Sequence, residues 1–231
     1  IKNIHVIVEL IGGSSGLAFK IANKTLREKK HLITANKALL AVHSEKLSEL
    51  AKKNSVNICF EAAVAGAIPI VNVLENRMLS EDISNIYGIL NGTCNYILSQ
   101  MSEKKISFDT ALKNAQNEGF AEADPYDDIS GNDTAYKLVI LTNLIFSTNF
   151  KINNVYLEGI TKISNIDLEM GEKLGYTILL LGISNIKKKI IQLRVHPCLV
   201  PKNSLLAKVK NELNSVVIEG DMVGKTLLIG K

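Results

Sequence analysis

Residues 4–13 read IHVIVELIGG, an almost unbroken run of β-branched and other apolar side chains that ends in two glycines. A run of this kind is typical of a buried parallel strand that opens into a tight turn. Helical spacing follows over residues 18–30, a second short strand over residues 31–34, helical spacing again through residue 51, and a third strand over residues 56–60. Strands that alternate with helices predict an α/β fold with a doubly wound parallel sheet.

The pattern changes after this third strand. Small residues run to Ala67 and Pro69 follows, so we place a domain boundary between residues 69 and 70. The remainder mixes both kinds of element, which predicts an α+β domain over residues 70–231 after an α/β domain over residues 1–69. The expected strands are residues 83–90, 190–195, 215–219 and 226–229, and the expected helices are residues 70–78, 93–101, 108–118 and 132–146.

The composition excludes several classes of protein. With 231 residues, 46% of them hydrophobic and 22% charged, the chain is long enough to fold around a real core. The net charge of +4 is spread along the sequence, and the one tight basic run, residues 187–189, is typical of a solvated turn, so nucleic acid is not an expected partner. No apolar run reaches the roughly 18 residues of a membrane-spanning helix, so a membrane is not expected either.

The cysteines and histidines show no pattern of a disulfide framework or a metal site. Three cysteines lie far apart, which indicates a reducing compartment, and we therefore expect a cytoplasmic protein. The four histidines have no metal-ligand spacing and are interpreted as surface or packing residues.

One segment concentrates the charged groups. GFAEADPYDD (residues 119–128) carries four acids, and a helix that begins near Asn132 then places Lys137 one turn after Asp133. Acids before a helix are commonly caps, and such a pair is commonly a solvated surface pair. At about 100° per residue, however, Ile140, Leu141 and Leu144 lie on the same stripe, and a helix that is apolar nearly all round is predicted to be buried. The two charges then either pair or line a cavity for a polar ligand, and a lysine among carboxylates can serve as a proton donor.

Three other motifs are weaker signals of function. Lys37 stands in the first turn of a helix, where the helix dipole disfavours a cation, so it hints at a ligand contact. Asn91-Gly92-Thr93 offers free N–H groups to an anionic or polar ligand, or is an ordinary turn with an N-cap. The small residues of 61–69 could leave carbonyl groups free for a hard cation, or serve tight helix packing.

Four motifs in register closely resemble homoserine dehydrogenase: TANKA (residues 34–38), FEAAVAGAIPI (60–70), GILNGTCNYIL (88–98) and EADPYDDISGNDTAYK (122–137). The resemblance covers essentially the whole chain. It implies NAD- or NADP-dependent interconversion of L-homoserine and L-aspartate 4-semialdehyde in threonine, methionine and isoleucine biosynthesis. It also implies an α/β fold in which an incomplete Rossmann-like nucleotide-binding domain precedes an α+β catalytic and dimerisation domain, and a homodimer.

The resemblance also assigns roles to residues. It implies that Lys137 is the proton donor and acceptor, with Asp133 beside it in catalysis. Substrate binding is implied for Glu122, Asp127, Asp133, Gly92 and Thr93, and cofactor binding for Ile11, Gly12, Lys37 and Gly119. A sodium-like ion is expected on the main-chain carbonyls of Glu61, Val64, Gly66 and Ile68.

Departures from the family pattern keep two alternatives open. We expect the chain to be a fragment that lacks the first strand, its G-x-G-x-x-G turn and the closing C-terminal segment, and therefore to bind cofactor weakly. The choice between NAD and NADP stays open. The alternatives are a non-catalytic amino-acid-binding or interaction protein, and another dehydrogenase that acts on an amino acid.

Overall fold

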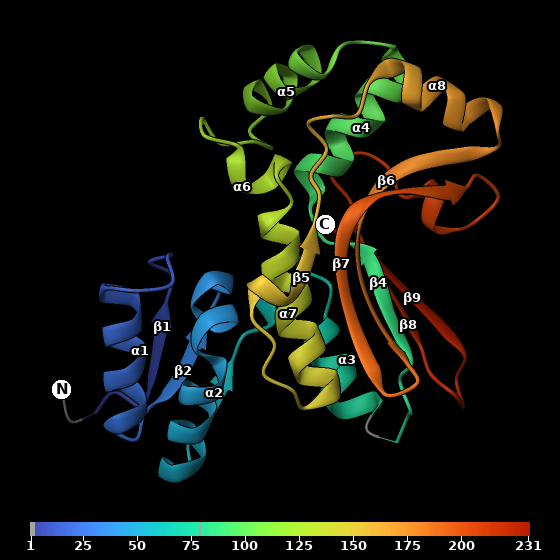
Figure 1. The fold of residues 1–231 in the computed structure, drawn as a ribbon. Helices are drawn as coiled ribbons and strands as arrows, with labels where there is room; N and C mark the ends of the chain where they lie inside the picture. The colour runs from blue at the N-terminus through green and yellow to red at the C-terminus, as the bar shows by residue number, and fades with distance from the viewer. Residues whose placement is uncertain (1–2, 79) are drawn as a thin grey trace.

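The computed structural model describes residues 3–78 and 80–231, so the first two residues of the expected domain 1–69 lie outside the described part. These residues form two sheets, one of three strands and one of six. In Figure 1 the three-stranded unit lies at the N-terminal end and the six-stranded unit contains the rest of the chain. The fold is the mixed α/β arrangement that the sequence predicts.

The small sheet is parallel, as predicted, with the order β1-β2-β3. Its strands are β1 (Val6–Glu9), β2 (His31–Thr34) and the two-residue β3 (Ile58–Cys59), joined by α1 (Leu17–Arg27) and α2 (Lys37–Asn54). Both connections step across the sheet in the same direction, so right-handed crossovers put both helices on one face. Leu26 of α1, Leu39 of α2 and Leu32 of β2 share one core cluster.

The doubly wound arrangement is not present among these elements. Val6, Val8 and Ile33 on the opposite face are 45%, 57% and 41% exposed, because neither described helix covers them. An apolar strand run predicts that both faces of the sheet are suited to burial, but it does not predict which helix covers each face.

The large sheet has the order β5-β7-β6-β4-β8-β9, antiparallel except for the parallel β5–β7 pair. Its strands are β4 (Asn85–Ile89), β5 (Val155–Leu157), β6 (Tyr176–Lys187), β7 (Ile190–Pro201), β8 (Asn214–Glu219) and β9 (Lys225–Gly230). The helices are α3 (Ile70–Arg77), α4 (Gly92–Lys104), α5 (Phe108–Asn117), α6 (Tyr126–Ile129), α7 (Asn132–Phe146) and α8 (Asn165–Lys173), with short 3-10 turns at Glu61–Ala63, Ile152–Asn154 and Leu206–Lys208.

The strand predictions fell short in the middle of this sheet. The long β6–β7 hairpin was recognised only at residues 190–195, and β5 and α8 were not predicted at all. Polar residues such as Ser184 and Asn185 interrupt the apolar run of β6, which hides its length from a periodicity argument. The basic run was correctly predicted to be a turn, because Lys188 and Lys189 close the hairpin with φ of 50° and 68°.

Helix α7 connects the two units. It packs against β6 on one side and against α2 on another, in the centre of Figure 1. Gly182 of β6 allows this approach, since a Cβ there would lie 3.0 Å from Leu90 Cδ1 and 3.1 Å from Thr134 Cγ2. The first turns of α2 and α7 are thereby brought to one place. Within residues 3–78 and 80–231, no helix has both the length and the apolar character that crossing a membrane requires.

Candidate functional site

The first turn of α7 carries a buried ion pair. Asp133 is 2% exposed, and its Oδ2 lies 2.7 Å from Lys137 Nζ one turn further along. The side chain of Lys137 is 15% exposed. Leu138, Val139, Ile140 and Leu141 are buried as well, which confirms the prediction that this helix is buried and directs its charges inward.

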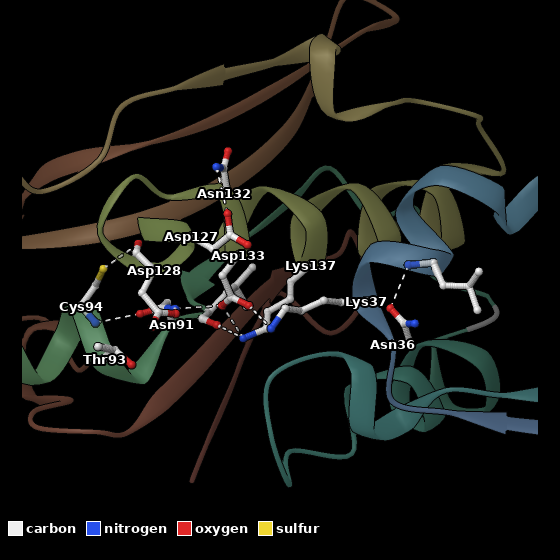
Figure 2. Close-up of polar contacts among 12 residues, drawn as sticks. Asn36, Lys37, Asn91, Thr93, Cys94, Asp127, Asp128, Asn132, Asp133 and Lys137 are labelled. Carbon is white, nitrogen blue, oxygen red and sulfur yellow. Dashed lines mark hydrogen bonds and ion pairs between the residues drawn. The ribbon is translucent and has the colours of Figure 1, made fainter. Parts of the chain in front are cut away.

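A second lysine reaches the same carboxylate from the other unit. Lys37 is the first residue of α2, and its Nζ lies 2.6 Å from Asp133 Oδ1. Asn36 fixes the start of α2, because its Oδ1 accepts a hydrogen bond from Leu39 N at 3.0 Å. Figure 2 shows Lys37 and Lys137 converging on Asp133 from different helices. One carboxylate therefore joins the three-stranded unit to the six-stranded one.

Asn91 and Asp128 complete the cluster. The Asn91 amide nitrogen donates to Asp128 Oδ1 at 2.7 Å and to Asp133 Oδ2 at 2.9 Å, and Asn91 itself is 5% exposed. Its Oδ1 accepts from Cys94 N at 2.7 Å, which makes it the N-cap of α4. Asp128 lies on α6, the short helix before α7. The cluster of Lys37, Asn91, Asp128, Asp133 and Lys137 thus draws on four elements, and we call it the lysine–carboxylate cluster.

The charges in the cluster set one another's protonation. Burial raises the pKa of the Asp133 carboxyl, but the ammonium groups of Lys137 and Lys37 outweigh burial and hold that pKa below its ordinary value. Burial lowers the pKa of Lys37, yet the Asp133 carboxylate outweighs it and raises that pKa. Burial also raises the pKa of Asp128, which the hydrogen bond from Asn91 opposes and the charge of Asp133 reinforces. Asp133 is therefore ionised at neutral pH, and Asp128 is the carboxylate easier to protonate.

The other two predicted substrate carboxylates lie outside this cluster. Asp127 is exposed and accepts a hydrogen bond from Asn132 Nδ2 at 3.2 Å, as Figure 2 shows. Glu122 is exposed, and its carbonyl accepts a hydrogen bond from the Gln116 side chain at 3.2 Å. The structure therefore brings Asp128, rather than its neighbour, into contact with the site.

The start of α4 lies beside the cluster. Gly92 is packed so closely that a Cβ there would lie 2.4 Å from the carbonyl oxygen of Glu212. The Thr93 hydroxyl donates to the carbonyl of Phe120 at 2.6 Å, so it ties α4 to the loop after α5. Gly119 in that loop has φ of +78°, is exposed and has open space at its Cβ position. Thr93 is therefore buried against this loop, whereas Gly119 is exposed.

The turn after β1 is tied to the start of α2. Ile11 N donates to Glu9 Oε1 at 2.7 Å, and the Thr34 hydroxyl donates to Glu9 Oε2 at 2.7 Å. The Asn36 amide donates to the carbonyl of Gly13 at 2.8 Å. Gly12 is exposed with φ of +83° and nothing near its Cβ position. The residues predicted to contact cofactor at 11, 12 and 37 therefore lie at the same edge of the parallel sheet, where nucleotides bind in such folds.

The segment predicted to bind a cation forms a tight turn. The Glu61 carboxylate accepts from Val71 N at 2.8 Å and from Asn72 N at 3.0 Å, so it caps α3. Its carbonyl accepts from Val64 N, and that of Ile68 accepts from Ile70 N. In the described part of the chain, the carbonyls of Val64 and Gly66 accept no hydrogen bond from another backbone group.

Neutral carbonyls of this kind suit a monovalent cation better than a transition metal. Over the residues that the structure describes, no group of three or more His, Cys, Asp or Glu side chains could hold a metal. The cation at 61–68 stays a prediction.

Sequence reasoning missed Asn91, Asp128, Asn36 and Glu9. Asp128 stood inside the acidic segment, where two adjacent aspartates gave no reason to prefer one. Asn91 was recognised as part of a turn with an N-cap, and that geometry is present. Its contacts with two carboxylates depend on the packing of α4 against α6 and α7, which no local pattern reveals.

Known proteins resemble the chain over its whole length. The family model described as homoserine dehydrogenase matches residues 69–231, and the one described as homoserine dehydrogenase, NAD binding domain, matches residues 1–61. A homoserine dehydrogenase of Neisseria gonorrhoeae is 46% identical over 229 residues, which cover 99% of this chain and 52% of that protein. One from Helicobacter pylori is 43% identical, with 99% and 54% covered. The chain spans about half the length of the curated relatives it matches.

Solved structures agree with these matches. The crystal structure of a homoserine dehydrogenase from Thiobacillus denitrificans superposes with a TM-score of 0.96 at 43% identity, covering 98% of this chain and 52% of that one. A hyperthermophilic archaeal homoserine dehydrogenase mutant in complex with NADPH superposes with a TM-score of 0.82 at 28% identity, covering 98% and 65%. The two family models, the similar curated proteins and the shared fold agree, and the chain belongs to the homoserine dehydrogenase family.

Proposed function

We propose that the protein that carries this chain catalyses the NAD(P)-dependent interconversion of L-homoserine and L-aspartate 4-semialdehyde, in the biosynthesis of threonine, methionine and isoleucine. The observation that carries the proposal is the buried carboxylate of Asp133 held by Lys137 at 2.7 Å and by Lys37 at 2.6 Å. This pairing brings a proton donor of the second unit to the nucleotide-binding edge of the first.

Lys137 would move the proton. Its ammonium donates to Asp133 Oδ2 at 2.7 Å and to the carbonyl of Leu90 at 2.8 Å. An ammonium has three N–H groups, so one remains for the oxygen of the substrate. In the reducing direction, Lys137 gives this proton to the aldehyde oxygen as hydride reaches the aldehyde carbon. In the oxidising direction, neutral Lys137 takes the hydroxyl proton as hydride leaves the same carbon.

Carboxylates would hold the amino group of the substrate. An ammonium needs negative partners in a site with little water, and the amide of Asn91 holds Asp128 next to Asp133, the carboxylate that Lys137 contacts. Glu122 and Asp127, which are both exposed, stay proposed substrate ligands. Gly92 and Thr93 are proposed to contact the substrate or the nicotinamide at the start of α4.

The cofactor is proposed to contact Ile11, Gly12, Lys37 and Gly119. The exposed left-handed glycines at 12 and 119 support this, because each allows a ligand to approach the backbone closely. A bound nicotinamide supplies the hydride acceptor or donor. The proposed sodium ligands are the carbonyls of Glu61, Val64, Gly66 and Ile68. The carbonyls of Val64 and Gly66 support this, because they accept no backbone hydrogen bond among the residues that the structure describes.

Further proposals concern the organisation of the protein. We propose domains at residues 1–69 and 70–231, supported by the separate sheets and by family matches that meet between residues 61 and 69. A homodimer is supported by an exposed apolar stripe along and just beyond α8, where Ile166, Met170 and Leu174 are 72%, 54% and 69% exposed. The cytoplasm is supported by three cysteines that are all free.

The test mixes the protein with homoserine and NAD or NADP, and measures formation of the reduced nicotinamide by its near-ultraviolet absorbance. We expect turnover in the unaltered protein and its loss in Lys137→Ala. Binding of homoserine in calorimetry without any turnover would instead favour a non-catalytic amino-acid-binding protein. Turnover of a different amino alcohol in preference to homoserine would favour another dehydrogenase.

A further inference from the structure

Asn91 stands at a point where it can control the geometry of both carboxylates in the lysine–carboxylate cluster. We infer that Asn91 is a positioning residue that holds Asp133 and Asp128 in the orientation that Lys137 and the substrate require. This inference rests on the proposed function and assigns a role to a side chain that neither moves a proton nor carries a charge.

The amide of Asn91 is fixed in its rotation. Its oxygen accepts from Cys94 N at 2.7 Å in the first turn of α4, and only the nitrogen can then face the carboxylates. That nitrogen has two hydrogens, and each has an acceptor: Asp128 Oδ1 at 2.7 Å and Asp133 Oδ2 at 2.9 Å. With its amide atoms engaged on both sides and 5% of its surface exposed, the side chain has no room to turn. Figure 2 shows it between the two aspartates.

Asn91 also acts where two negative charges would otherwise repel. Asp128 and Asp133 face each other across the amide, and a neutral donor between them stabilises both in the ionised form. Asp133 Oδ2 receives Asn91 and Lys137 together, so the amide directs the carboxylate toward the proton-transfer lysine. Leu90, the residue before Asn91, supplies the carbonyl that holds Lys137 from the other side. Two consecutive residues therefore position the same ammonium.

The groups that face Asp128 come from every element around it. They are Asn91 and Cys94 of α4 and its cap, Asp133 and Lys137 of α7, and Lys37 of α2. Removal of the Asn91 amide takes away one of the interactions that favour its ionised form. Protonation of Asp128 should then begin at higher pH.

The competing explanation is that Asn91 serves only as a helix cap. The Asn91→Ser variant distinguishes this explanation from the positioning role. Asn91→Ser keeps a good N-cap for α4 and removes both amide donors. Asn91→Asp keeps the cap and places a third carboxylate against Asp128 and Asp133. Ser107→Ala is the matched control, because it removes the cap of α5, which accepts from Thr110 N, away from the cluster.

The experiment measures kcat, KM and the pH dependence of kcat/KM for homoserine, together with thermal unfolding. For Asn91→Ser we expect kcat to fall roughly 10- to 100-fold, as loss of hydrogen bonds to charged groups implies. The acidic limb should move to higher pH, while the unfolding temperature changes no more than in Ser107→Ala. Asn91→Asp should lose more activity than Asn91→Ser. Unaltered kcat and pH profile in Asn91→Ser would overturn the inference, as would activity lost only in proportion to folded protein.

A failure of the proposed function would be recognised separately. If the unaltered protein does not turn over homoserine, the proposed function fails, and the inference is then decided by the pKa of Asp128 from carboxyl-carbon NMR. A higher pKa in Asn91→Ser than in the unaltered protein supports the positioning of the carboxylates. An equal pKa overturns it.

Discussion

Lys37 and Lys137 bind opposite oxygens of one buried carboxylate, that of Asp133, at 2.6 and 2.7 Å. The first lysine belongs to the three-stranded unit and the second to the six-stranded unit. Neither ammonium has another carboxylate within ion-pair distance among the residues that the structure describes. The junction of the two units and the proposed proton-transfer site therefore depend on the same side chain.

Asp133→Asn should abolish most of the activity. The amide keeps the shape but leaves two ammonium groups without their shared charge, so we expect kcat to fall by about 100-fold or more. Because both lysines are partly exposed, the free energy of unfolding should fall by only about 1–3 kcal/mol. Steady-state kinetics and urea unfolding measure the two effects. Asp109→Asn, an exposed change in the first turn of α5, serves as control, and equal kinetics in both variants would contradict the assignment.

Lys37→Met should lower stability in a pH-dependent way. The pKa of Asp133 is lowered below 3.8, so its share of the stability is fully present above that pH and is lost as pH falls through the folded pKa. The pKa of Lys37 is raised above 10.5, so its share is present below that pH and is lost as pH rises through the folded pKa. The stability difference between the unaltered protein and Lys37→Met should stay constant between these limits and shrink beyond either one. Chemical unfolding across pH measures the difference, and a difference that stays the same well below pH 3.8 and well above pH 10.5 would contradict the pairing.

Gly182→Ala should displace α7. A Cβ at this position would lie 3.0 Å from Leu90 Cδ1 and 3.1 Å from Thr134 Cγ2, so these side chains must shift, and we expect α7 to shift with them. We expect a loss of about 1–3 kcal/mol in the free energy of unfolding and reduced kcat, since Leu90 also holds Lys137. Ile183→Val, which changes a half-buried side chain in the cluster on the other face of the sheet, should cost about 1 kcal/mol and leave kcat unchanged. Equal kcat in both variants would show that the helix position is not critical.

Replacement of sodium should lower thermal stability. If the carbonyls at residues 61–68 bind the ion, exchange of sodium for tetramethylammonium at constant ionic strength should lower the unfolding temperature. Glu61→Gln should weaken the cap of α3 yet keep most of this sodium dependence, because the proposed ligand at that position is the carbonyl. Differential scanning calorimetry measures both. An unfolding temperature that is the same in the two salts would refute the cation.

Helix α7 was predicted with its observed ends because its apolar spacing is strong and Gly131 precedes it. The burial of Asp133 and half-burial of Lys137 followed from the same geometry. Strand β6 was not predicted, because Ser184 is fully buried without being apolar, and a periodicity argument counts it as exposed.

The contact between Lys37 and Asp133 could not be derived from sequence, because it depends on how α2 docks against α7. The choice between Asp127 and Asp128 was equally out of reach. Successive residues of a helix point about 100° apart, so in α6 one of the pair faces the site and the other faces solvent. The two aspartates are visible in the sequence, but the rotation of so short a helix about its own axis cannot be predicted from it. Only the packing of α6 on α4 and α7 decides it.

The position of β4 between β6 and β8 has a kinetic consequence. The β6–β7 hairpin closes through a two-residue turn and can form early. Strand β4 lies between β6 and β8, and both of these partners come much later in the sequence. Leu90 and Asn91 follow directly from β4, so we expect the lysine–carboxylate cluster to assemble after these distant strands have paired. Recovery of enzymatic turnover during refolding should therefore lag behind the recovery of secondary structure, and would report the last step of folding rather than the first.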